Sequence, residues 1–202
     1  MAAFGGCLLI LLVGAVFLAG WAIWRYNNLI SLRNQVANGW KQIDVQLKRR
    51  HDLIPNLVET VKGAMSFERG TLEAVIAARN QAIGLLRGGG GAVPSGAEVR
   101  QLAAAENQLS GALGKLFAVV EAYPQLKATG NVTTLQEELT STENKIAFAR
   151  QLYNDQATNY NTAQQQFPTN MVAGVAGASP AELWEIADAA EREVPKVNLA
   201  AT

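Results

Sequence analysis

The chain has 202 residues, of which 49 % are hydrophobic, and 17 basic and 17 acidic residues give it a net charge of zero. This length suffices for one domain with a real core, and the neutral charge argues against a general nucleic-acid-binding protein. With one cysteine, Cys7, the chain has no intramolecular disulfide.

The first 24 residues carry no charged side chain and lead into aromatic residues beside an arginine. A helix of roughly twenty apolar residues crosses the hydrocarbon core of a bilayer, so residues 1–24 are predicted to be a transmembrane anchor. A cleaved signal peptide fits less well, because no basic segment precedes the apolar run and bulky aromatics occupy the place of small cleavage-site residues. The predicted membrane-interface residues are Trp21, Trp24, Arg25 and Tyr26.

Three basic residues, Arg25, Arg33 and Lys41, follow the predicted span before the first acidic residue, Asp44. Positive residues near a span tend to remain in the cytoplasm. We therefore expect a single-pass protein with its N-terminus outside and the rest of the chain in the cytoplasm.

Apolar residues then recur at steps of three and four, which is the period of one face of a helix. The spacing predicts one long helix over residues 25–87. Pro55 removes a backbone hydrogen bond within it, so the helix is expected to be kinked or broken there. The first part of its apolar stripe consists of Leu29, Leu32, Val36, Trp40, Ile43 and Leu47.

Residues 88–97 are predicted to form a flexible glycine-rich connection, and they lack the Gly-Lys-Ser/Thr of a phosphate loop. Helices are predicted over 98–123, 133–166 and 180–193. The last has a strong start signal, because Ser179 would cap it, Pro180 would begin it and Glu182 would complete a capping box. The prediction is an all-α protein whose N-terminal transmembrane helix continues into a long-helix antiparallel four-helix bundle, residues 25–194, followed by a C-terminal tail, 195–202.

Three stretches of the chain resemble the LemA family of bacterial membrane-anchored proteins. They are NNLISLRNQVANGWKQIDVQLKRRHDLIPNLVETVKGAMSFERGTLE (27–73), LQEELTSTENKIAFARQLYNDQATNYNTAQQQFPTN (135–170) and PKVNL (195–199). The resemblance implies one N-terminal anchor in the bacterial inner (cytoplasmic) membrane and a four-helix cytoplasmic bundle. It implies no catalytic residues. The small residues of 174–178 depart from the bulkier, more aromatic pattern of the family.

The chain has few residues suited to catalysis or metal binding. His51 is its one histidine, no Glu-x-x-His pair is present, and a zinc site would need more His or Cys ligands. A nucleophile paired with a histidine would have to use His51, which lies in a basic cluster. We expect no enzyme activity, no metal or other cofactor, no small-molecule substrate and no nucleic-acid partner.

Charge is distributed unevenly along the chain. Residues 25–87 hold ten basic and five acidic residues, a net of +5, whereas residues 88–202 hold seven and twelve, a net of −5. The halves could attract one another within one bundle or between copies, or the segregation could be chance. The basic cluster Lys48, Arg49 and Arg50 is expected to pair with acids such as Glu137, Glu138 and Glu143, in preference to phosphates of lipid or nucleic acid.

Helix lengths leave the stripe from Leu29 to Leu47 without an obvious partner in its own chain, and such a stripe is rarely left in water. Either copies pack side by side, or the helix breaks at Pro55 and residues 27–50 lie against the bundle or the membrane surface. Met171, Val172 and Val175, in an apolar loop over 171–178, form a second candidate contact. The resulting hypothesis is a non-catalytic membrane-anchored scaffold that forms homo-oligomers and organises or shapes membrane lipid. The alternative is a monomeric adaptor that binds the helix of a partner protein through Trp40 and the stripe.

Overall fold

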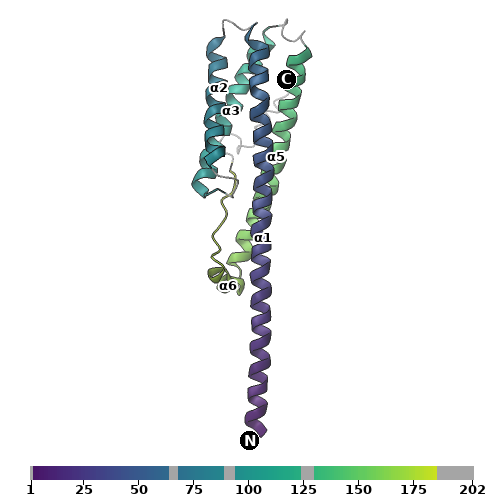
Figure 1. Cartoon of the computed structure of the whole chain (residues 1–202), viewed down its shortest axis with the longest axis vertical. Helices are drawn as coiled ribbons and strands as arrows, with labels where there is room; N and C mark the ends of the chain where they lie inside the picture. Colours follow the sequence, from purple (N-terminus) through teal and green to yellow (C-terminus); the bar gives the residue numbers. More distant parts are fainter. Residues whose placement is uncertain (1, 64–67, 89–93, 124–129, 186–202) are drawn as a thin grey trace, which may run out of the picture.

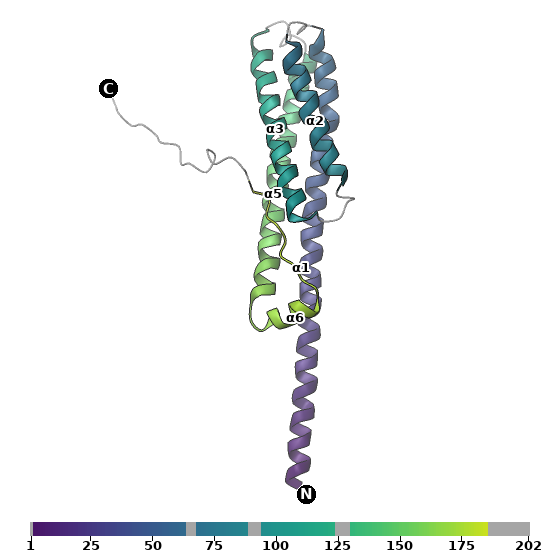
Figure 2. The same cartoon turned by 90° about the vertical axis from the view of Figure 1, so that its left-hand side faces the viewer.

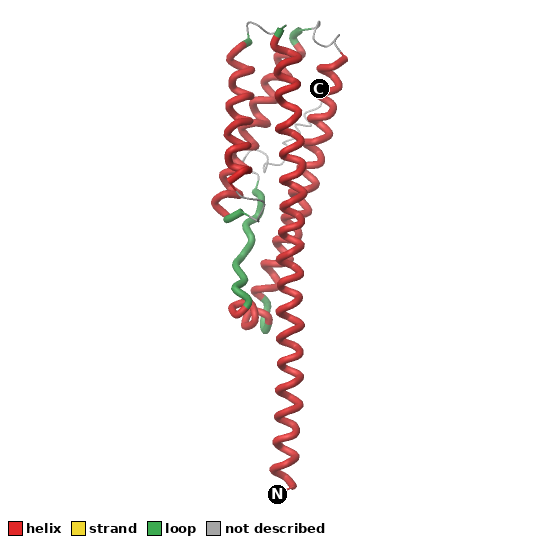
Figure 3. Tube along the Cα trace, viewed as in Figure 1, coloured by secondary structure: helices red, strands yellow, loops and turns green. Residues whose placement is uncertain are grey.

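The computed structural model describes residues 2–63, 68–88, 94–123 and 130–185, and these residues confirm the predicted all-α class. Figure 3 shows helices and loops, with no strand in the described ranges. The helices are α1 (Ala2–Lys62), α2 (Arg69–Gly88), α3 (Gly96–Glu121), α5 (Gly130–Gln165) and α6 (Thr169–Val175).

Four of these helices alternate in direction to form an upright bundle (Figures 1 and 2). α1 extends well beyond the bundle toward the N-terminus, and α5 is its main neighbour. At 1.5 Å per residue, α1 is about 90 Å long, α5 about 54 Å, and α2 and α3 about 30 and 39 Å. Of these four helices, all lie in the upper part, whereas only α1 and α5 reach the lower part, where other segments complete the core.

The single helix expected over residues 25–87 is wrong, because α1 ends at Lys62 and α2 begins at Arg69. Glycines lie at both edges of this break, Gly63 and Gly70, and each costs about 1 kcal/mol in a helix interior. The turn lets two apolar stripes pack together, since Ile54, Leu57 and Val61 of α1 share a core with Leu72 and Val75 of α2. Helical periodicity is the same in both arms, so it could not distinguish one long helix from a hairpin. The fourth helix of the bundle comes from this division.

Pro55 neither breaks α1 nor ends it. A proline leaves the carbonyl four residues earlier without its helical hydrogen bond, which here is the carbonyl of His51. Nε of Arg79, on α2, donates a hydrogen bond to this oxygen at 2.7 Å. The neighbouring helix thus satisfies the group that the proline exposes, and helix α1 continues for two further turns.

The predicted helix 98–123 corresponds to α3, and the predicted helix 133–166 corresponds to α5. α3 begins with a capping box that the sequence reading did not single out. The Ser95 hydroxyl accepts from the Glu98 N–H at 3.5 Å, and the Glu98 carboxylate accepts from the Ser95 N–H at 2.7 Å. The hydrogen bonds from the backbone and side chain of Ser95 lower the pKa of Glu98.

The helix expected over 180–193 is wrong for residues 180–185, and residues 186–193 and the tail 195–202 lie outside the described part. Residues 178–185, here called the strap, are not helical and run upward from α6 beside α1 and α5 (Figures 1 and 2). Glu182 bonds Arg100 at 2.6 Å instead of completing a capping box with Ser179. Tertiary contacts outweigh the local helix signal.

Asparagine side chains of α5 hold the strap by its backbone. The Asn161 amide donates to the Ala181 carbonyl at 2.7 Å and accepts from the Ala181 N–H at 2.8 Å. Asn154, two turns away on the same face, makes the same pair of bonds with Trp184 at 3.0 and 2.8 Å. These two side chains satisfy backbone groups that a helix would otherwise pair internally.

Candidate functional site

The segment of α1 that projects from the bundle is apolar and exposed. Described side chains between Leu9 and Leu18 are 59–75 % exposed where they are large and hydrophobic. From Leu9 on, α1 is long and apolar enough to cross a membrane, and it is the one helix of this kind in the described ranges. Exposure of such a segment to water would be unfavourable, so its length and composition suit a membrane anchor.

The predicted interface residues gather where this segment meets the bundle. The Arg25 guanidinium lies 4.7 Å from the ring centroid of Trp24 and 5.8 Å from that of Trp21. These cation–π distances hold the positive charge beside two amphipathic rings. Tyr26 is partly exposed at the same level. This group has the chemistry of a membrane–water boundary, with aromatic rings and a cation near one height along the helix.

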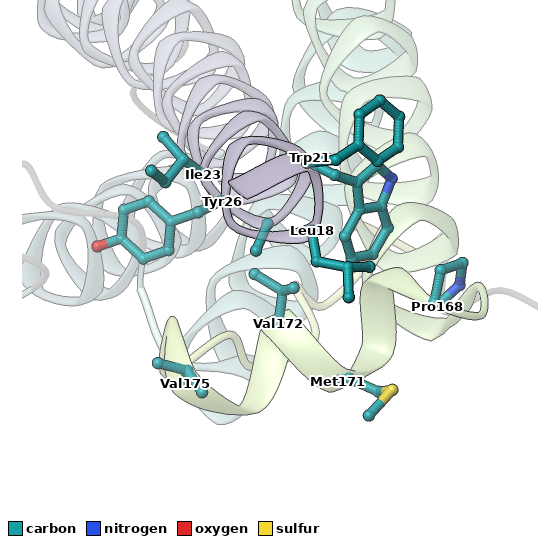
Figure 4. A pocket seen from close by; sticks show the side chains of 10 residues that line it. Leu18, Trp21, Ile23, Tyr26, Pro168, Met171, Val172 and Val175 are labelled. Carbon is teal, nitrogen blue, oxygen red and sulfur yellow. The ribbon is translucent and has the colours of Figure 1, made fainter. Parts of the chain in front are cut away.

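An apolar groove of about 810 Å³ lies between this level of α1 and the short helix α6. Figure 4 looks along α1 and shows α6 lying crosswise to it, with Val172 near Leu18 and with Met171 and Val175 toward the two ends of α6. The loop expected over 171–178 is therefore helical as far as Val175. The lining residues are Phe17, Leu18, Trp21, Ala22, Ile23, Tyr26, Pro168, Met171, Val172 and Val175.

The stripe that the sequence left without a partner is buried within its own chain. Leu29, Val36, Trp40, Ile43 and Leu47 belong to one core cluster with residues of α5, and Leu32 packs against it partly buried. α5 is long enough to run down to the level of Leu29, and the strap covers the side that lacks further helices. The expectation of an unpartnered stripe is therefore wrong. It was based on the lengths of the predicted helices, which did not reveal that α5 and the strap lie beside the stripe.

Trp40 is the centre of this lower core and is only 3 % exposed. Its ring centroid lies 5.6 Å from that of Tyr153 on α5 and 5.8 Å from that of Trp184 on the strap. The Arg150 guanidinium lies 4.9 Å from the Trp184 ring centroid. An aromatic residue from each of three segments thus meets here, and Trp40 is not accessible to a partner helix.

Tyr153 also joins α5 to the strap through its hydroxyl group, which donates to the Glu182 carbonyl at 2.7 Å. Burial, with a smaller contribution from the charge of Glu182, raises the pKa of Tyr153 to about 12. The phenol consequently stays protonated, and able to donate, through the whole neutral range.

A buried ionic cluster separates the lower core from the upper one. Glu106 of α3 is fully buried and accepts from His51 Nε2 at 2.8 Å and from Arg50 at 3.4 Å. Arg50 also bonds the Ser110 hydroxyl at 2.8 Å and pairs with Glu143 of α5 at 2.9 Å. The cluster joins three helices, and it puts the one histidine of the chain against a carboxylate in the interior.

The predicted electrostatic contacts are thus brought together in part. Arg50 reaches Glu143 as expected, but its buried partner Glu106 was not foreseen. Lys48 pairs with Asp44 on its own helix at 2.6 Å, whereas Arg49, Glu137 and Glu138 lie on the exposed surface. At Arg50 the basic and acidic halves of the chain attract one another inside one bundle.

A second hollow, which the sequence reading missed, lies on the side of the bundle between α1 and α5. Phe148 is 74 % exposed there, and Val45 and Leu152 lie beside it. Lys41 and Lys145 also line this hollow, here called the lateral groove, which has a volume of about 450 Å³. The sequence feature that could have indicated this groove is Phe148, a large apolar residue that lies outside the buried heptad positions of α5.

In the ranges that the structure describes, no three His, Cys, Asp or Glu side chains gather in a way that could hold a metal ion. The imidazole of His51 is itself buried, and its Nε2 lies 2.8 Å from the Glu106 carboxylate.

Comparison with known proteins gives a consistent result. A sequence model of the LemA family matches residues 39–199. The magnetosome proteins MamQ 1 and MamQ 2 of Paramagnetospirillum magneticum are each 26 % identical to this chain over 178 residues, covering 80 % of this chain and 65 % of theirs. Protein LemA of Metamycoplasma hominis is 25 % identical over 177 residues, covering 87 % of this chain and 73 % of that protein. The chain thus spans slightly less than two thirds of the length of the MamQ relatives.

Proposed function

Since the chain belongs to the LemA family, with residues 39–199 matching it, we propose that it is a membrane-anchored, non-catalytic helical scaffold. In this proposal copies associate with one another and so organise or shape the membrane lipid around them. The single observation that carries it is the unbroken α1, which is an apolar span at one end and a core helix of the bundle at the other. A continuous helix transmits the position and tilt of the bundle to the bilayer.

Self-association would use the lateral groove, because the stripe from Leu29 to Leu47 is already buried. Phe148 and Val45 expose apolar surface there, and Lys41 and Lys145 add positive charge. The second half of the chain carries the opposite charge, with Glu137 and Glu138 exposed on α5. A contact between two different surfaces of neighbouring copies can be repeated from copy to copy, and it forms a closed ring only if the rotations between copies add up to a full turn. Such a contact therefore suits an extended array.

The same proposal places the bundle in the cytoplasm of a bacterium, at the inner membrane. The basic residues Arg25, Arg33 and Lys41 support this orientation, since they follow the span before any acid. The names of the MamQ relatives refer to the magnetosome and to no reaction. Protease added to intact spheroplasts should leave the bundle uncut, and cleavage there would reverse the orientation.

A non-catalytic role is supported by the chemistry of the described polar residues. His51 and Glu106 are paired in the interior, where a substrate has no access. No cofactor, small-molecule substrate or nucleic acid is part of the proposal. Purified protein that retained stoichiometric metal after dialysis against a chelator would contradict it.

A monomeric adaptor is the second candidate, and the lateral groove again favours it. An amphipathic partner helix with acidic flanks would match an apolar hollow bordered by Lys41 and Lys145. Trp40 cannot be the docking residue, since it is buried between α5 and the strap.

The experiment that separates the two is the mass of the full-length protein in mild detergent, measured by light scattering. A mass well above that of the monomer, which falls to the monomer mass on Phe148→Glu, supports the scaffold. Ile76→Glu is the matched control, because Ile76 is an exposed apolar residue on α2, away from the groove. A monomer at high protein concentration would refute self-association and leave the adaptor.

A further inference from the structure

At the lower end of the bundle, beside the span, the segment that lies against α1 carries no charge. Residues 156–181, which include the end of α5, all of α6 and the start of the strap, contain no Asp, Glu, Lys, Arg or His. At the 17 % average of this chain, a stretch of that length would hold about four charged residues. Charged side chains are costly near hydrocarbon, so their absence here suits an end that faces a bilayer.

The height of α6 along α1 points to the same boundary. From Ala2 to Trp24 the helix rises about 33 Å, close to the roughly 30 Å of a hydrocarbon core. The upper limit of the hydrocarbon therefore falls near Trp21 to Tyr26. The groove between α1 and α6 is lined by α1 residues from Phe17 to Tyr26, so α6 lies beside this boundary and not above it.

The side chains of α6, together with Phe167 two residues before it, include a buried group and an exposed apolar group. Thr169 and Ala173 are buried against the bundle. Phe167, Met171 and Val175, spaced four residues apart, are 79, 69 and 86 % exposed. Three large apolar side chains exposed within nine residues would be unfavourable in water, and no charged residue of α6 offsets them.

We propose that α6 is a foot of the bundle, lying in the headgroup–acyl boundary of the leaflet beneath it. Phe167, Met171 and Val175 point into this layer, and the groove between α6 and α1 holds an acyl chain of a membrane lipid. The groove fits this occupant because Phe17, Leu18 and Trp21 of the span form one wall, so an acyl chain enters it without leaving the bilayer. Its volume of about 810 Å³ lies in the range of ordinary ligand sites.

The foot gives α6 a role that an anchor alone does not supply. α1 by itself holds the bundle at the membrane, whereas α6 adds a second contact to one side of α1 and so sets the tilt of the bundle. A helix inserted into one leaflet also takes up area in that leaflet only. The inference rests on the membrane anchoring in the proposed function and is independent of self-association.

The test is photo-crosslinking of the full-length protein in vesicles of dioleoyl phosphatidylethanolamine and dioleoyl phosphatidylglycerol. Position 171 is replaced by p-benzoylphenylalanine in one variant, and position 148 in a matched control. Both sites are exposed and apolar, so neither change disturbs the core, and Phe148 lies roughly 25 Å above the lower end of α5. After irradiation, intact-protein mass spectrometry identifies what each position has captured, and mild base then cleaves the lipid esters.

The expected result is a lipid adduct at position 171 that keeps the mass of a fatty acid after base treatment, with no lipid adduct at position 148. Three results at position 171 would overturn the proposal. They are the absence of lipid adducts, an adduct that keeps only glycerophosphate and headgroup, and a crosslinked dimer, which would mean that a second copy fills the groove. A dimer at position 148 instead reports on self-association, so the two proposals succeed or fail separately.

Discussion

Replacing Arg79 by Met should destabilise the bundle, because one backbone carbonyl oxygen would lose its hydrogen bond. Arg79 Nε donates to the carbonyl of His51, which Pro55 leaves without a helical partner. A hydrogen bond from a charged donor contributes about 1.5–3 kcal/mol, and the partial exposure of Arg79 favours the lower end. For a chain of this size, each kcal/mol shifts the melting temperature by about 2–4 °C, so the melting temperature should fall by roughly 3–12 °C.

A double-mutant cycle with Pro55→Ala isolates this bond from the other contacts of Arg79. Alanine at position 55 restores an N–H that can bond the His51 carbonyl within α1. Pro55 is exposed, so its replacement leaves no cavity. In the Pro55→Ala background, Arg79→Met should therefore cost little, and the coupling between the two sites should be about 1–2 kcal/mol, within the range for groups that share a partner.

The assay is thermal unfolding of the full-length protein in mild detergent, followed by near-ultraviolet circular dichroism. This signal reports the packing of aromatic side chains, Trp40 and Trp184 among them, and not the helicity of the span. Arg69→Met is the control, because Arg69 is an exposed arginine on the same helix. The reasoning would be refuted if Arg79→Met lowered the melting temperature equally with proline and with alanine at position 55. The effect would then not depend on the carbonyl that Pro55 leaves free.

The remaining predictions concern the ionic cluster, the strap and the helix contacts. Glu106→Ala removes the buried carboxylate that bonds both Arg50 and His51, and it should lower the free energy of unfolding by about 3–5 kcal/mol in urea titrations. Asn161→Ala removes both bonds to the strap backbone, so amide hydrogen exchange of residues 181–185 should accelerate while that of the upper core stays slow. Gly39→Ala should cost about 1–3 kcal/mol in thermal melts, because a Cβ there would lie only 3.2 Å from the backbone of α5. Gly111→Ala, in open space on α3, should instead stabilise by about 0.4–1 kcal/mol. The raised pKa of Tyr153 means that its stabilisation is complete below pH 10 and is lost as pH rises to about 12, which ultraviolet absorbance of the phenolate will follow.

Each of these predictions has an outcome that contradicts it. A cost of under about 1 kcal/mol for Glu106→Ala, the usual size for an exposed ion pair, would mean that the cluster is hydrated. Uniformly faster exchange in the Asn161 variant would show that the strap does not open separately from the bundle. Equal effects at Gly39 and Gly111 would deny close packing of α1 on α5. Ionisation of Tyr153 near pH 10 would show that its hydroxyl is not held by the strap.

The sequence predicted the parts of this fold that depend on local patterns. The apolar run before Trp24 indicates a membrane-spanning helix by composition alone, and α1 has the required length and exposure. The heptad spacing of Leu139, Ile146 and Tyr153 predicted the buried face of α5, and these residues lie in the core. Such patterns are readable because a helix presents every third or fourth residue to one side, whichever neighbour that side meets.

Predictions failed where distant residues compete with a local signal. Ser179 and Pro180 have the form of a helix start, but Asn154 and Asn161 of α5 bind the backbone that follows and keep it extended. The spacing from Ile54 through Val75 is compatible with one helix, yet the chain turns between α1 and α2 because the turn buries both stripes together. Neither outcome follows from periodicity, since each depends on contacts between residues far apart in the chain.

The amino-acid sequence by itself determined that this protein is helical, that one end suits a bilayer and that its apolar residues form continuous stripes. Only the tertiary structure decided what covers each stripe. α5 and the strap bury Trp40, while Phe148 and the exposed stripe of α6 remain uncovered. The physical reason is that hydrophobic burial has no direction of its own. A stripe requires cover, and the lengths, turns and hydrogen-bonding groups of the other segments select which segment supplies it.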